Sequence, residues 1–559
     1  MTAFALVAAL LLGVAMPGAE PAVAATYVPI SGAGSTWSQN ALDQWKANVK
    51  QYGMTVNYNP TGSSDGRNQF RNGTVDYGVS EIPYGIKDSG VVDSPPSRKY
   101  AYMPIVAGGT SFMYNLMIGN RRVTNLRLSG EVVAKIFTGQ IKTWNDPEIK
   151  ADNPALASAL PARRVVPVVR SDGSGTSAQF TKWLSVKHRS LWDDYCRRAG
   201  RQTPCGETSN FPIVPGSGFV GQSGSNGVSG YVAQRGNVGT ITYVEYSFAV
   251  YTTHFPVAKV LNEAGYYTEP TAKNVAVALT KARIEENPSS PEYLTQKLEG
   301  VYNDTDKRSY PLSSYSYMII PTKLESNFNA QKGKTLGAFA YYFLCQGQQR
   351  VDRLGYSPLP INLVEAGLQQ VRKIPGVNPE NINIKNCHNP TFSSDGTNTL
   401  AKTAPYPPAC DFKGPTQCST GTGGAKTPTT VNGSGSGSGS GGSSSGSAQG
   451  GTNGGSTGSG GATAGAGGKG TGGTTTGTGS GGATGGPGGA TIDPDTGQVI
   501  GDSGGAAGGS GDAFAVPVTT SRGIGGGTRT VLMAVAGVLL VAITVGPPLI
   551  GRRLKRGRS

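Results

Sequence analysis

A long run of glycine, serine and threonine constrains the fold more than any other feature of this sequence. It extends from about residue 414 to residue 527, where many of the chain's 84 glycines are concentrated. Such a run buries too little apolar surface to offset the entropy that ordering costs. We expect residues 413–528 to be a flexible tether with an r.m.s. span of roughly 55 to 65 Å, which confines the folded domain to residues 26–412.

Both ends of the chain carry apolar segments of the kind that direct a protein to a membrane. Residues 1–25 resemble an export signal, in which an apolar run precedes the small-residue cleavage pattern Ala-Val-Ala at 22–24. Residues 530–550 carry no charge and are long enough, as a helix, to cross ~30 Å of hydrocarbon. The basic segment 551–559 follows directly, and such flanks stay in the cytoplasm. We expect a single-pass protein of the cell membrane whose domain is extracellular.

The six cysteines agree with export, because an even number in an exported chain favours disulfides. Cys196 and Cys205 close a short loop and are expected to pair. Three pairings remain open for the other four, which are Cys345, Cys387, Cys410 and Cys418. The three histidines lie in no metal-binding motif, so we expect neither a metal nor a cofactor.

The net charge of +15 allows two interpretations. Part of this excess belongs to segment 551–559, and the remainder would attract anions over a long range. A basic exported domain without an anionic ligand explains the remainder equally well. Because basic residues do not cluster with interleaved aromatic residues, we expect no binding of nucleic acid.

Residues 26–412 alternate between two periodicities. Helical spacing of apolar residues occurs at 41–49 and at 132–137. Short apolar runs of strand length occur between such segments, at 57–59, 75–79, 102–106, 165–169 and 240–244. The alternation predicts an α/β fold with helices layered on a sheet.

Three turns rich in glycine and hydroxyl residues precede predicted helices, at residues 31–37, 61–66 and 171–176. The first residues of a helix leave backbone N–H groups unpaired and carry partial positive charge, so they can bind an anion. Arg170 stands at the end of a predicted strand and offers a planar fork of donors. Together these features favour a site for a tetrahedral oxyanion.

Six segments in this order resemble the phosphate-binding proteins of bacterial high-affinity phosphate ABC transporters. They are GAGSTW at 32–37, GSSDGRNQFRNGTVDYGVSE at 62–81, LSGEVVAKIFTGQIKTWND at 128–146, VVRSDGSGTS at 168–177, VEY at 244–246 and LGYSPLP at 354–360. The resemblance implies a type II periplasmic-binding-protein fold, with two α/β lobes, a hinge and a central cleft. It also implies extracytoplasmic binding of inorganic phosphate and its delivery to permease subunits.

The resemblance assigns the contacts with phosphate to eight residues. They are Thr36, the backbone of Trp37, Ser63, Glu81, Arg170 as the charged clamp, Ser174, Gly175 and Thr176. Asp172 would orient Arg170 in the same family. Helix capping is an alternative role for Asp172 and Ser174.

The chain departs from the family pattern at two of these positions. Trp37 replaces the usual phenylalanine, and the pattern D-F-G-A-S-D reads DYGVSE at 76–81, which places Glu81 where the family has aspartate. In the family this carboxylate is understood to accept the proton that phosphate carries and sulfate lacks. With the extra methylene, either the cleft is reshaped or Glu81 turns away and another acceptor takes its role.

Three other functions compete with phosphate transport. The fold could bind another oxyanion such as sulfate, or serve as a surface phosphate sensor or adhesin. Gly62 to Gly66 also fits the hydrolase pattern G-x-S-x-G, with Ser64 as the nucleophile. We expect no enzyme, because the histidines lie in no recognisable motif that would supply a base.

Overall fold

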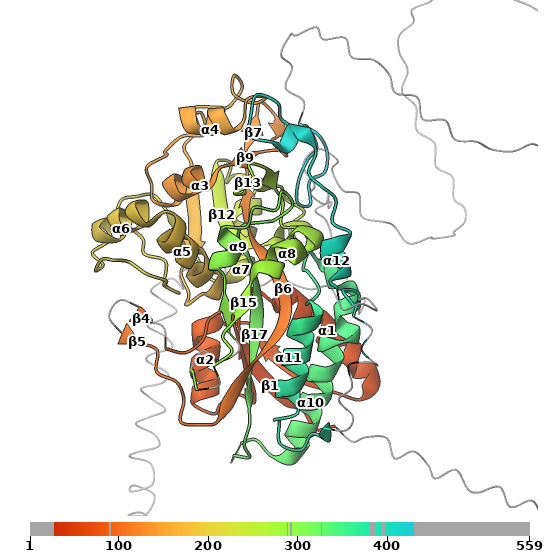
Figure 1. Cartoon of the computed structure of the whole chain (residues 1–559). Helices are drawn as coiled ribbons and strands as arrows, with labels where there is room; N and C mark the ends of the chain where they lie inside the picture. Colours follow the sequence, from red (N-terminus) through yellow and green to blue (C-terminus); the bar gives the residue numbers. More distant parts are fainter. Residues whose placement is uncertain are drawn as a thin grey trace, which may run out of the picture. The chain divides into compact units, whose positions relative to one another are not determined.

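The computed structural model describes most of the domain (Figure 1). It covers residues 27–429 except 86, 89–90, 288, 291–292, 294, 326, 380–383, 385–386, 388 and 393–396. The expected export signal, most of the tether and segment 530–550 lie outside the described residues, as does all of the separate unit formed by residues 501–559. Among the described helices, none combines the length and the apolar character that crossing a membrane requires.

A mixed sheet runs through the whole domain in the order β11-β10-β12-β6-β17-β3-β1-β2. At one end, β1 is parallel to β2 and β3, and at the other end β10 is parallel to β11 and β12. The strands of this path are β1 (Ile30–Gly34), β2 (Val56–Asn59), β3 (Tyr77–Ser80), β6 (Tyr100–Tyr114), β10 (Val166–Arg170), β11 (Val220–Gln222), β12 (Thr240–Glu245) and β17 (Ser313–Pro321). β13 (Val257–Leu261) also pairs with β6, and it pairs with β9 (Arg127–Leu128) and β14 (Tyr267–Thr268).

Strand β6 belongs to both halves of this sheet. Its residues 100–109 pair with β17, and its residues 110–114 pair with β12. The change of partner divides the domain into a first lobe around β1, β2, β3 and β17 and a second lobe around β10, β11 and β12. The expected α/β fold with two lobes is confirmed.

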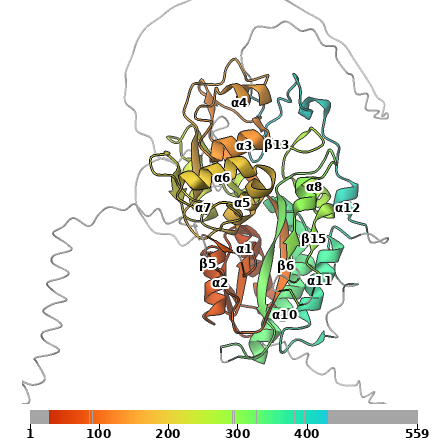
Figure 2. The same ribbon diagram turned by 60° about the vertical axis from the view of Figure 1, so that its left-hand side comes forward.

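Helices cover both lobes (Figure 2). In the first lobe, α1 buries Ala41, Leu42, Trp45 and Val49, which recur at helical spacing as the sequence predicts. In the second lobe, the Ser129 hydroxyl caps α3 by accepting from the Val132 N–H. The first lobe carries α1 (Gln39–Val49), α2 (Ser63–Arg71), α10 (Ala330–Leu344) and α11 (Ile361–Val371), and the second carries α3 (Gly130–Phe137), α5 (Gly175–Lys187), α6 (Arg189–Arg198) and α7 (Gly224–Ala233).

Shorter elements complete the described part of the domain. The helices are α4 (Pro147–Asp152), α8 (Ala272–Ala278), α9 (Glu299–Tyr302) and α12 (Thr399–Lys402). The strand pairs are β4 (Lys87–Asp88) with β5 (Val91–Val92), β7 (Met117–Ile118) with β8 (Arg121–Arg122), and β15 (Arg283–Ile284) with β16 (Gln296–Lys297).

The packed chain continues beyond residue 412. Residues 413–429, which composition assigns to the tether, lie against the second lobe. Thr422 is fully buried and donates to the Thr124 carbonyl at 2.9 Å. The guanidinium of Arg127 donates to the carbonyl of Thr416 at 2.9 Å. Hydrogen bonds and the Cys410–Cys418 disulfide, rather than apolar side chains, hold this segment, so among its residues only Cys418 signals its order in the sequence.

The described cysteines form three disulfides. The expected Cys196–Cys205 pair is confirmed. The three pairings left open by the sequence are resolved as Cys345–Cys387 and Cys410–Cys418.

Gly66 marks the closest approach between α2 and β1, and its replacement tests this packing. A Cβ on Gly66 would lie 2.2 Å from the Gly34 Cα and 2.6 Å from the Ala33 carbonyl oxygen. Because both are backbone atoms, the helix must move, and we expect Gly66→Ala to lower the free energy of unfolding by about 1 to 3 kcal/mol in urea titrations.

Gly230 in α7 provides the matched control. A Cβ there would meet nothing within 4 Å, so Gly230→Ala should leave stability unchanged or raise it by about 0.5 to 1 kcal/mol. Equal unfolding midpoints for the two variants would contradict the close packing of α2 on β1.

Candidate functional site

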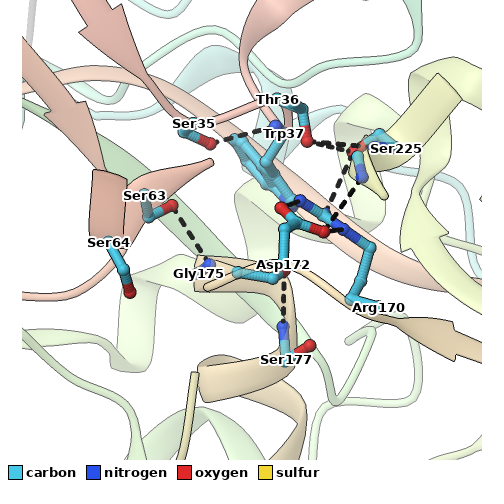
Figure 3. Close-up of polar contacts among 12 residues, drawn as sticks. Ser35, Thr36, Trp37, Ser63, Ser64, Arg170, Asp172, Gly175, Ser177 and Ser225 are labelled. Atoms are coloured by element: carbon cyan, nitrogen blue, oxygen red, sulfur yellow. Dashed lines mark hydrogen bonds and ion pairs between the residues drawn. The ribbon is translucent and has the colours of Figure 1, made fainter. Parts of the chain in front are cut away.

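The three turns singled out in the sequence meet between the two lobes (Figure 3). Direct hydrogen bonds join the second and third turns across the interface. The Gly175 N–H donates to the Ser63 hydroxyl at 3.1 Å, and the Ser64 N–H donates to the Gly173 carbonyl at 3.0 Å. The structure therefore places the starts of α2 and α5 against each other.

The start of α5 combines a capped turn with an unpaired hydroxyl. The Ser174 hydroxyl accepts from the Ser177 N–H at 3.1 Å, so Ser174 caps the helix. Thr176 is buried, and its hydroxyl has no hydrogen-bond partner among the described residues. This end of α5 therefore has one hydroxyl without a partner beside backbone N–H groups, of which those of Gly175 and Ser177 donate to serine hydroxyls.

Arg170 and Asp172 form a forked ion pair at the end of β10. The Arg170 Nε donates to Asp172 Oδ1 at 2.7 Å, and its Nη2 pairs with Oδ2. The Gly224 N–H, at the start of α7, donates to the same Oδ1 at 2.9 Å. Asp172 thus orients Arg170, and it does not cap α5, the helix that follows it; it accepts instead from the first residue of α7, a contact that the sequence did not predict.

Burial and pairing with Arg170 shift the pKa of Asp172 in opposite directions. Burial raises the pKa of this carboxyl, but the hydrogen bonds and the charge of Arg170 outweigh burial. The pKa of Asp172 therefore lies below its ordinary value. The Arg170 side chain is only 2% exposed.

Glu81 turns into the site rather than away from it. Its Oε1 accepts from the Ser35 hydroxyl at 2.5 Å and from the Ser316 hydroxyl at 2.8 Å. Its Oε2 accepts from the Ser63 hydroxyl at 2.8 Å. A Cβ on Gly175 would lie 2.0 Å from Oε2, so the longer carboxylate of Glu81 fits only against a glycine.

The carboxyl of Glu81 is in a strongly desolvated environment, with the residue 1% exposed. Burial is the largest influence and raises its pKa. Hydrogen bonds from Ser35, Ser63 and Ser316 and the charge of Arg170 lower it, and the net shift is upward.

Thr36 and Trp37 lie on the turn between β1 and α1. The Thr36 and Ser225 hydroxyls are 2.9 Å apart, and the backbone N–H of Trp37 donates to the Ser35 hydroxyl at 2.9 Å. The indole packs edge-on against Tyr356, with ring centroids 5.7 Å apart. A Cβ on Gly108 would lie 2.9 Å from the indole, so this glycine makes room for the ring that replaces phenylalanine.

Three serines of the site were missed in the sequence. Ser225 lies in the first turn of α7, after the hydroxyl and glycine pair Ser223-Gly224 that opens the helix, so the same signal could have identified it. Ser35 lies within the first turn and was not singled out. Ser316 stands in the middle of the buried strand β17, where nothing distinguishes it from a structural serine.

The hydrolase alternative finds no base beside its serine. The Ser64 hydroxyl donates to the Ser209 hydroxyl at 3.1 Å. His188 packs against Trp183, and burial lowers its pKa to about 4. His254 contacts the Val250 carbonyl. Neither of these two histidines, which are the ones that the structure describes, is hydrogen-bonded to Ser64.

Comparisons with known proteins identify the family of the chain. Residues 19–346 match the family model described as a PBP superfamily domain. The phosphate-binding protein PstS of Haemophilus influenzae is 30% identical over 336 residues, which cover 60% of this chain and 90% of that protein. The PstS of Xylella fastidiosa is 32% identical over 342 residues, which cover 60% and 83%.

A structure of a high affinity periplasmic phosphate-binding protein bound with phosphate is also similar. It has a TM-score of 0.48 and 18% identity, and the match covers 65% of this chain and 100% of that one. The family model defines the class of the protein, which is the PBP superfamily. Within this class, the chain belongs to the family of the phosphate-binding proteins PstS.

The Arg170–Asp172 pair predicts a pH-dependent stability. The pKa of Asp172 is lower in the folded protein than in the unfolded chain, where it is about 3.9. The pair therefore stabilises the fold fully above about pH 4, and this contribution is lost as the pH falls through the lower, folded value. Asp172→Asn should cost about 1.5 to 3 kcal/mol in urea titrations at pH 7, and the difference from the parent should shrink below about pH 4.

Asp194 supplies the control, because it is 47% exposed and its partners Arg197 and Arg198 lie on the surface. Asp194→Asn should change stability by no more than about 1 kcal/mol. An Asp172→Asn deficit that stays constant down to pH 3 would rule out the ionised pair.

Proposed function

We propose that the protein binds inorganic phosphate outside the cytoplasmic membrane and delivers it to the permease of an ABC transporter. One observation carries the proposal. A buried arginine, held in a fork by Asp172, stands beside the start of α5 and the hydroxyls of Thr36 and Ser63. The relatives in the same family are named phosphate-binding proteins, which supports this ligand.

The charges of the site favour an anion that carries a proton. Asp172 balances most of the charge of Arg170, so the start of α5 and the neighbouring hydroxyls supply much of the attraction for an anion. Glu81 adds a carboxylate that can only accept hydrogen bonds when it is ionised. Phosphate can donate a proton to it, whereas sulfate at neutral pH meets uncompensated repulsion.

The proposal assigns ligand contacts to the residues that the sequence analysis predicts. Arg170 binds phosphate oxygens as the charged clamp, and Gly175 and Thr176 donate from the start of α5. Ser63, Ser174, Thr36 and the backbone of Trp37 are the remaining contacts; in this structure the Ser63 hydroxyl donates to Glu81 and the Trp37 N–H donates to Ser35. The proposed function is binding and delivery, and in the described structure the Ser64 hydroxyl contacts the Ser209 hydroxyl and the Arg67 guanidinium.

Calorimetric titration tests the ligand. The purified protein is stripped of bound anions by unfolding and refolding, and is then titrated with phosphate, arsenate and sulfate. We expect tight binding of phosphate and arsenate and much weaker binding of sulfate, because only the first two present a proton to Glu81. A correctly folded protein that does not bind phosphate would overturn the proposal, and a preference for sulfate would favour the other oxyanion class.

Replacement of Arg170 tests the clamp. Arg170→Ala should lose about 2 to 5 kcal/mol of phosphate binding, because the partner charges remain buried without it. Arg170→Lys should restore only part of the affinity, since an ammonium lacks the planar fork. Arg197→Ala, a control at an exposed surface pair, should bind like the parent. Parental affinity in Arg170→Ala would exclude the clamp.

The proposal also includes attachment to the membrane by residues 530–550, with the domain outside and residues 551–559 in the cytoplasm. The uncharged segment and its basic flank support this topology. Limited trypsin treatment of intact cells should cut the tether, for example at Lys469 or Arg522, and release a fragment that contains the domain. Protection of the domain until the membrane is broken would show that the orientation is reversed.

A further inference from the structure

The two carboxylate oxygens of Glu81 are not equivalent. Oε1 accepts two hydrogen bonds, from Ser35 at 2.5 Å and from Ser316 at 2.8 Å. Oε2 accepts one, from Ser63 at 2.8 Å. An ionised carboxylate has about two acceptor positions on each oxygen. Oε1 is therefore saturated, whereas Oε2 keeps one position for another donor.

Oε2 is the carboxylate oxygen that lies against the start of α5. A Cβ on Gly175 would be 2.0 Å from Oε2 and 2.6 Å from the Ser63 hydroxyl oxygen. Gly175 is the first residue of α5, and its N–H points at Ser63. The part of the carboxylate that can still accept a proton thus faces the helix end to which we assign the phosphate.

We infer that Ser316, together with Ser35, sets the anion selectivity, because the two hydroxyls occupy Oε1, favour the ionised carboxylate and leave Oε2 to accept the proton of the bound oxyanion. This inference rests on the proposed function and names residues outside the contacts that the family resemblance assigns. In this arrangement Ser316 is a positioning residue, and it acts on the ligand only through Glu81.

Among the groups around Glu81, the hydroxyls of Ser35, Ser63 and Ser316 oppose the effect of burial on its pKa most strongly. Burial raises the pKa of Glu81, and Arg170 on β10 opposes burial less than the three serine hydroxyls do. Glu245 on β12 also faces it, as do Tyr58 on β2 and Tyr356. Burial raises the pKa of each of these three groups.

Loss of the Ser316 hydroxyl therefore raises the pKa of Glu81 further. A protonated Glu81 can donate a hydrogen bond and no longer repels a fully ionised anion. The selectivity for phosphate should then disappear at a higher pH than in the parent, because protonation of Glu81 begins at a higher pH.

Strand β17 contains a matched control two residues away. Ser314 is also buried, but its hydroxyl has no hydrogen-bond partner among the described residues. Ser314→Ala removes the same atom from the same strand without touching Glu81. Ser316→Thr keeps the hydroxyl, and Ser316→Cys replaces it with a weak donor of similar size.

The experiment measures phosphate and sulfate affinities by competition titration of the full-length protein and its variants between about pH 5.5 and pH 8. We expect Ser316→Ala to reduce the ratio of phosphate to sulfate affinity at least tenfold at the acidic end. Ser316→Cys should move in the same direction by less, whereas Ser316→Thr and Ser314→Ala should follow the parent. Glu81→Gln should lose the preference at every pH, because it has no ionised form.

Circular dichroism and unfolding midpoints identify the variants that are folded. A folded Ser316→Ala or Ser316→Cys protein with the parental ratio and pH profile would overturn the inference and leave Ser316 a structural residue. Failure of the parent itself to bind phosphate, or to prefer it to sulfate, would instead refute the proposed function.

Discussion

The site depends on a single strand that serves two lobes. β6 pairs with β17 through its first ten residues and with β12 through its last five, and the change occurs between Gly109 and Thr110. Because the strand is continuous, the two sheets meet without an intervening linker, and loops from opposite lobes lie within hydrogen-bond distance. The contacts of Ser63 and Ser64 with the start of α5 follow from this arrangement.

The sequence predicted the chemistry of the site better than the extent of its central strand. The apolar run at 102–106 is only part of β6, which spans Tyr100–Tyr114, because the Gly-Gly pair at 108–109 looks like an interruption. In the structure these glycines are required by packing, since a Cβ on Gly108 would meet Glu245 and Trp37, and a Cβ on Gly109 would meet Pro270. Contacts of this kind come from distant parts of the chain and leave no local pattern.

The same distinction applies to individual side chains of the site. The pairing of Arg170 with Asp172 and the capping by Ser174 are local, and the sequence placed both. Ser316 reaches Glu81 across 235 positions of sequence, and no periodicity marks it. The methylene that distinguishes Glu81 from aspartate is accommodated by such distant partners, with Gly175 on one side and Ser35, in the turn after β1, and Ser316 of β17 on the other.

The packing of residues 413–429 has a mechanical consequence. This segment is fixed to the second lobe, where the Thr124 N–H donates to the Thr429 hydroxyl at 2.7 Å and Lys426 pairs with Glu269. A force applied along the chain beyond residue 429 is therefore transmitted to the second lobe alone. The first lobe bears none of that load, so tension on the chain does not by itself pull the lobes apart across the phosphate site.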